Sequence, residues 1–149
     1  MLYDAVDEPA SLDAAALQAA YERELAAVVE AEGLDAVADE TGVDRDRLAA
    51  LDGERADSDT DVGQLTLSEA AAVLAVSDDY PDAEAIVMEV RDHLLLSMTT
   101  GVVDVDILAA NLDHDLTGQE VQQAIEGRNP MTLAQLAAIQ RFLAERNDR

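Results

Sequence analysis

The hydrophobic positions of the chain recur at helical spacing, and no run of alternating β-branched residues indicates a strand. Glycines, prolines and capping residues divide this pattern into eight segments. We therefore expect helices from Ser11 to just before Gly33, over Leu34–Thr41, Asp44–Asp52, Thr66–Leu74, Pro81–Thr100, Asp104–Leu112 and Thr117–Gly127, and from Thr132 onward. The predicted fold class is all-α.

Three of these helices open on a capping box, in which a threonine and a residue three positions later cap each other's backbone N–H groups. The three pairs are Thr66 with Glu69, Thr117 with Glu120, and Thr132 with Gln135. The helical period also predicts buried faces. These are Leu17, Tyr21, Leu25, Val28 and Val29 in the first helix, Ile86, Val90, Leu94 and Met98 in the fifth, and Leu133, Leu136, Ala137, Gln140 and Leu143 in the last.

The order of one long, two short and one medium helix occurs twice, which predicts a diverged internal repeat. Locally, Leu48–Leu51 with Asp52-Gly53 corresponds to Val121–Ile125 with Glu126-Gly127, and an arginine follows in each case. We predict a single compact unit over 1–149, with halves at 11–76 and 81–147 and an acidic loop at 54–65. Two unrelated helical hairpins are the alternative.

Composition changes this picture through charge. Among 149 residues there are 33 acidic and nine basic side chains, so the net charge is −24; all nine basic residues are arginine, and lysine and cysteine are absent. The acids are spread among alanine, valine and leucine, which indicates a solvating surface rather than an acidic tail. Concentrated salt would screen their repulsion. In composition the chain resembles proteins of salt-in haloarchaea, with K⁺ and water solvating the surface. An ordinary acidic mesophilic protein is the alternative.

The amino terminus has no basic residue and no long apolar run, so a signal peptide is not expected. No uncharged apolar window approaches the 18 residues of a membrane span. The expected location is the cytoplasm, without membrane contact.

The most specific motif is Ala38-x-x-x-Gly42-Val43-Asp44-x-x-x-Leu48-x-x-Leu51. In a helix-turn-helix, a small residue lets two helices cross closely, glycine forms the turn, and apolar residues seat the second helix. A looser version in the second half uses Ala110, Leu116 and Val121. Together with Met131-Thr132-Leu133, these patterns resemble helix-turn-helix domains of the lambda-repressor and Cro type.

That resemblance implies reading of the DNA major groove by the helices that start at Asp44 and Thr117. The residues facing bases would be Arg45, Arg47, Gln119, Gln122 and Gln123, and those facing phosphates Arg55 and Arg128. The local charges oppose this role, because Asp44–Arg55 and Thr117–Arg128 each sum to −1. Arginines spaced between aspartates are more typical of a salt-bridged solvent face.

Other candidate sites are weaker. The run from Asp57 to Asp61 is similar to a calcium loop, but Gly63 and Glu69 fall at loop positions seven and thirteen instead of six and twelve, so we expect a solvated linker. His93 and His114 each lack a second histidine nearby, which predicts no metal site. No nucleophile, phosphate-loop or dinucleotide motif occurs, so neither a cofactor nor catalysis is expected.

The run Leu94-Leu95-Leu96-Ser97-Met98 is uninterrupted by charge. We expect the two halves to bury it between them; a partner or dimer surface is the alternative.

The opening Met1–Asp7, the segment Asp92–Leu95 with Met98-Thr99-Thr100, and Val121–Gly127 with Met131–Leu133 resemble a small haloarchaeal family of unknown function. This resemblance implies no activity. We therefore expect a non-enzymatic binding or regulatory module that acts through protein–protein contact or self-association. A DNA-binding regulator of the lambda-repressor and Cro type is the alternative.

Overall fold

The protein was analysed as a computed structural model, which describes residues 14–49, 65–112 and 116–147. Within these ranges 77% of the residues are helical, in eight helices with no strand, so the predicted all-α class is confirmed. The helices are α1 (Ala14–Glu32), α2 (Leu34–Thr41), α3 (Arg45–Ala49), α4 (Leu67–Ala75), α5 (Ala83–Gly101), α6 (Val105–Asn111), α7 (Gly118–Ile125) and α8 (Leu133–Asn147).

Local capping interactions set most of the helix starts. All three predicted capping boxes form, at α4, α7 and α8. Helix α5 begins two residues later than expected: Asp82 is its N-cap, its side chain accepts the Ala85 N–H, and Pro81 precedes the cap. The turn after α2 uses Gly42 at φ 73°, a left-handed conformation that costs glycine no strain.

The two halves meet around an antiparallel bridge between Thr66 and Thr132. The Leu67 N–H donates to the Met131 carbonyl at 2.6 Å, and the Leu133 N–H donates to the Leu65 carbonyl at 2.8 Å. Leu133 lies 66 residues after Leu67, and Met131 lies 66 residues after Leu65, so each hydrogen bond is the counterpart of the other. The bridge therefore relates α4 and α8 by a local pseudo-twofold axis.

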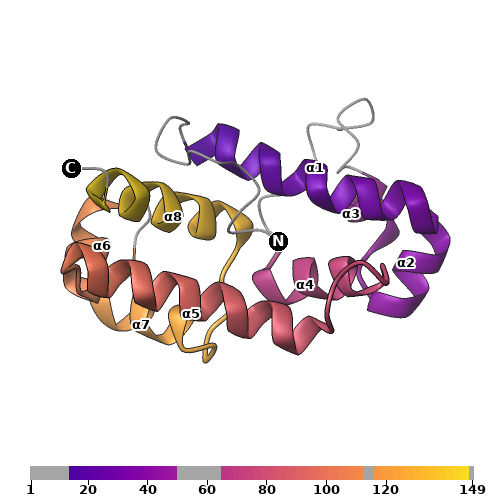
Figure 1. The fold of residues 1–149 in the computed structure, drawn as a ribbon. Helices are drawn as coiled ribbons and strands as arrows, with labels where there is room; N and C mark the ends of the chain where they lie inside the picture. Colours follow the sequence, from indigo (N-terminus) through magenta and orange to yellow (C-terminus); the bar gives the residue numbers. More distant parts are fainter. Residues whose placement is uncertain (1–13, 50–64, 113–115, 148–149) are drawn as a thin grey trace.

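Helix packing follows the same relation. Helix α1 packs against α8 as α5 packs against α4, while the α2–α3 and α6–α7 pairs lie at opposite ends of the molecule (Figure 1). Every buried residue of α4 has a buried counterpart 66 positions later in α8: Leu67, Ala70, Ala71, Val73 and Leu74 match Leu133, Leu136, Ala137, Ile139 and Gln140. This correspondence supports the internal repeat.

Helices α1 and α5 correspond with a shift of 69 residues, which relates their first and last residues as well. Of the face predicted for α1, Leu17, Tyr21, Leu25 and Val28 are buried, and Val29 is half-buried. In α5, the counterparts of Leu17, Tyr21 and Leu25 are Ile86, Val90 and Leu94, and all three are buried. Met98 and all five residues predicted in α8 are buried too, so the helical period located the core correctly.

The short helices correct one detail of the predicted repeat. Val37 in α2 and Leu108 in α6 are the buried residues of their helices. When Val37 is aligned with Leu108, the counterpart of Ala38 is Ala109, and both alanines are half-buried. Ala110 is exposed, so its expected role as the small crossing residue is wrong.

No single helix of the described residues is long and apolar enough to cross a membrane. Helices α5 and α6 pass that test only as a pair, and they are bent by 92° at their junction.

Candidate interaction surface

The arginines predicted to face DNA bases on α3 are engaged with carboxylates. Arg45 forms an exposed ion pair with Asp35, with Nε 3.0 Å from the carboxylate. Arg47 binds Glu69 through both terminal nitrogens, at 2.9 and 3.0 Å, and both side chains are partly buried. Because Glu69 belongs to the capping box of α4, Arg47 ties α3 to the start of α4.

The protonation of Glu69 reflects this bidentate contact. Burial opposes its ionisation, but the hydrogen bonds from Arg47 and from the Thr66 backbone, with the Arg47 charge, outweigh burial. The net effect lowers the pKa of Glu69 below its ordinary value. Glu69 therefore stays ionised as the partner of Arg47.

The predicted contact residues of α7 also have neighbours within their own segment. Gln122 donates to Glu126 at 3.0 Å, and Gln123 accepts from the Asn129 side chain at 2.7 Å. Arg128 lies 3.4 Å from the same Glu126 and is largely exposed. Gln119 is exposed on the first turn.

The structure does not bring the two predicted contact sets together, because α3 and α7 lie at opposite ends of the molecule (Figure 1). Arg55, the acidic run Asp57–Asp61 and His114 lie outside the described residues. His93 is half-buried on α5, and no group of three potential metal ligands occurs in the described part of the chain.

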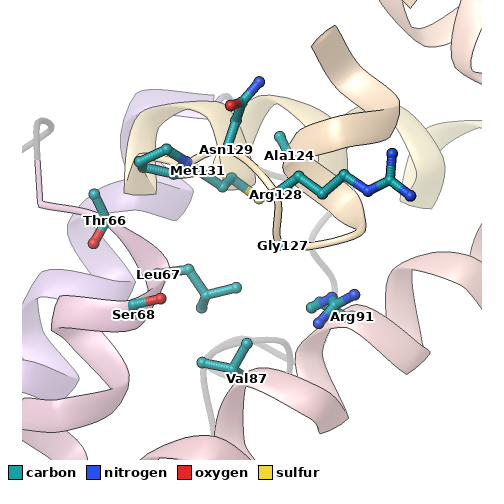
Figure 2. Close-up of a pocket in the computed structure, with 11 residues that line it drawn as sticks. Thr66, Leu67, Ser68, Val87, Arg91, Ala124, Gly127, Arg128, Asn129 and Met131 are labelled. Carbon is teal, nitrogen blue, oxygen red and sulfur yellow. The ribbon is translucent and has the colours of Figure 1, made fainter. Parts of the chain in front are cut away.

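A pocket of about 270 Å³ opens where the start of α4, the middle of α5 and the turn after α7 meet (Figure 2). Arg91 closes one side: it donates from Nε to the Ile125 carbonyl at 2.6 Å and from a terminal nitrogen to the Glu126 carbonyl. Figure 2 shows Arg128 on that same side. Arg91 thus caps the C-terminal end of α7, where a cation also complements the helix dipole.

The chemistry of this pocket is limited by its lining residues. Apart from the two arginines, the polar side chains are Thr66, Ser68 and Asn129, and the lining carries no carboxylate, imidazole or thiol. These residues supply no group of the kind that usually transfers protons in general acid–base catalysis. Sequence reasoning missed Arg91, because no local pattern shows that an α5 side chain reaches the end of α7.

The clearest surface feature is an exposed apolar stripe on α5. Leu94 and Met98 are buried as expected, but Leu95 is 49% exposed and Leu96 is 66% exposed. The expectation that the two halves bury this whole run is therefore wrong, because α4 and α8 cover only one side of α5. Together with Met88 and Val102, which are 54% and 79% exposed, these leucines form what we call the α5 apolar face.

The α5 apolar face lies largely within an uncharged segment. The ten residues 94–103 carry no ionisable side chain, although 28% of the whole chain is charged. Half of them are exposed: Leu95, Leu96, Thr99, Thr100 and Val102. The segment thus holds three of the four large hydrophobic side chains that are exposed in the described part of the chain.

The internal repeat provides a comparison for this face. The positions of α1 that correspond to Met88, Leu95 and Leu96 are all alanine, namely Ala19, Ala26 and Ala27. The position corresponding to Thr99 is Glu30. The same place in the same fold can therefore be occupied by small or charged residues, so the fold itself does not require large apolar side chains there.

Comparison with known families assigns the chain without assigning an activity. Residues 17–146 match the family of unknown function DUF5791. The chain belongs to this family. Searches of curated proteins and of solved structures give no match. The predicted membership in a family of unknown function is confirmed.

Proposed function

We propose that this DUF5791 protein is a non-enzymatic binding module that docks a protein partner on the α5 apolar face. The observation that carries the proposal is the exposure of Leu95 and Leu96, adjacent leucines on a 19-residue helix, within an uncharged segment of a chain of net charge −24. Covering a leucine side chain fully contributes about 1.5–3 kcal/mol, so even the exposed parts of two leucines favour association.

The small helix pairs support a helix-turn-helix-like scaffold for this module. Helices α2 and α3 are joined through the left-handed Gly42, and α6 and α7 occupy the corresponding place in the other half. The proposal also includes the location expected from the charge and composition, which is the cytoplasm of a halophilic organism. In that setting, the acidic surface keeps the module soluble because salt screens its repulsion, while the uncharged α5 apolar face can still associate with a partner.

The alternative function, DNA binding, has less support from the geometry. Arg45, Arg47 and Arg128 each pair with a carboxylate, so contact with phosphates or bases would require breaking those pairs. If DNA is nevertheless bound, Arg45→Ala together with Arg47→Ala should weaken the binding. DNA retention that is unchanged in this double variant would exclude the α3 contact.

A photo-crosslinking amino acid at position 96, introduced in the source cells, tests the docking face. The matched control carries the same amino acid at position 27, the corresponding exposed place on α1. We expect covalent adducts with another protein from position 96 and not from position 27. Adducts from neither position, or equally from both, would contradict a docking face on α5.

A further inference from the structure

The shape of the α5 apolar face matches a helical partner. Met88 and Leu95 lie seven residues apart, which places them in one row along α5, and Val102 caps the end of the helix seven residues further on. Fourteen residues of α-helix extend about 21 Å, so the row is long and narrow. A second helix laid along α5 could cover such a row, with Leu96 beside it.

The charges around the row are mainly acidic, and the exception is Arg146 of α8, which donates to the Gly101 carbonyl at the end of α5. The exposed ionisable side chains of α5 are Glu84, Glu89 and Asp92, and the exposed residues Asp104 and Asp106 follow its end. The arginine of α5, Arg91, is turned toward the carbonyls of Ile125 and Glu126. A partner therefore meets an apolar row that Asp92 interrupts between Met88 and Leu95, with a border of further acidic residues.

This border distinguishes between the possible occupants. A second copy of the chain would place its own five acidic residues beside these five, and it would add another net charge of −24. An anionic lipid surface would be repelled for the same reason. Cationic side chains that flank an apolar stripe would instead be attracted, and the attraction would speed the encounter and select this partner over others.

We propose that the α5 apolar face binds an amphipathic helix whose apolar stripe is flanked by arginine or lysine. The inference rests on the proposed docking function and adds the chemistry of the partner. Apolar contact with Leu95 and Leu96 would hold the helix, and Glu89 and Asp92 would select its charge.

Three synthetic 18-residue helices with the same leucine stripe, flanked by arginine, glutamine or glutamate, test this inference on the full chain. Their dissociation constants are measured calorimetrically at KCl concentrations where circular dichroism shows the protein folded. We expect the arginine peptide to bind at least tenfold more tightly than the glutamate peptide. That ratio should shrink as KCl rises, because salt screens the border.

Variants separate contact with the face from general attraction to an acidic protein. The double variant Leu95→Ala with Leu96→Ala introduces the alanines found at the corresponding positions of α1. It should raise the dissociation constant of the arginine peptide at least tenfold. Glu89→Gln with Asp92→Asn should remove most of the preference for arginine. Asp39→Asn with Glu40→Gln removes the same two charges from exposed positions on α2 and should leave the preference unchanged.

The outcomes distinguish the two proposals. Equal affinity for the three peptides, or no binding of any of them, would contradict the proposal of a cationic helical partner. The proposal of a docking face on α5 would then be decided by the cross-linking experiment. A concentration-dependent dimer in sedimentation equilibrium that the alanine pair abolishes would make a second copy the occupant. Peptide binding that survives the alanine pair would contradict both the partner and the face.

Discussion

At the scale of single residues, Val102 has the least favourable backbone of the described part of the chain. It caps α5 at φ 53° and ψ 52°, and it is the one non-glycine residue with positive φ among those described. The left-handed region costs an L-residue about 1–2 kcal/mol, and branching at Cβ worsens the crowding. The corresponding position after α1 is Gly33, at φ 94°.

Neighbouring contacts hold Val102 in this conformation. The Val103 N–H donates to the Met98 carbonyl at 2.8 Å, and Arg146 from α8 donates to the Gly101 carbonyl at 2.9 Å. These bonds satisfy carbonyl groups at the end of α5 and join it to the end of α8. The turn is therefore kept by its surroundings against the preference of its central residue.

We predict that Val102→Asn raises the free energy of unfolding by about 1 kcal/mol, because asparagine tolerates the left-handed region. The change is measured by urea denaturation. Val102→Thr is the control, since it keeps the branched Cβ while removing the exposed apolar side chain, and it should give no comparable gain. An asparagine variant no more stable than the threonine variant would show that the strain is not relieved.

At the scale of elements, the two equivalent helix interfaces use different chemistry. Between α1 and α8, the buried Tyr21 hydroxyl donates to the buried Gln140 side chain. The corresponding residues of the α4–α5 interface are Leu74 and Val90, both buried and apolar. Burial also raises the pKa of Tyr21 far above its ordinary value, so its hydroxyl remains a donor.

A double-mutant cycle checks the coupling across this interface. Tyr21→Phe should cost about 1–3 kcal/mol of unfolding free energy, because Gln140 loses a buried partner. Adding Gln140→Leu should recover most of that loss, since two apolar side chains need no hydrogen bond. Chemical denaturation of the four proteins gives the coupling energy. A double variant at least as unstable as the sum of the single variants would disprove it.

At the scale of the whole molecule, the excess of 24 acidic charges determines how stability depends on salt. Repulsion among exposed carboxylates is felt over about 10 Å in 0.1 M salt and over about 3 Å in 1 M salt. Low salt therefore destabilises the folded chain more than its expanded unfolded state.

We predict that the melting temperature rises steadily between 0.1 and 2 M KCl. Each kcal/mol of relieved repulsion should add roughly 2–4 °C for a chain of this size. Sucrose is the control, because it favours compact states without screening charge. If KCl has no effect on melting, the charges do not limit stability, and the halophilic interpretation of the composition is wrong.

Much of the fold was predictable because helices are encoded by contacts between residues three or four positions apart. The capping boxes at Thr66, Thr117 and Thr132 need only their own segments, and all three form. The stripe Ile86, Val90, Leu94 and Met98 follows from the helical period, and all four residues are buried. The eight helices of the described residues, and most of the residues that they bury, thus follow from the amino-acid order.

The candidate site was less predictable, because it depends on contacts between distant segments. Arg47 has the appearance of a DNA-reading residue in the sequence, but Glu69, 22 positions away, engages its guanidinium. Arg91 reaches the carbonyl of Ile125, 34 positions away. Leu95 and Leu96 continue the same apolar run as Leu94, and only the placement of α4 and α8 leaves them in solvent. A run of apolar residues specifies that a helix has a large hydrophobic surface, whereas the packing of neighbouring helices specifies how much of that surface remains for a partner.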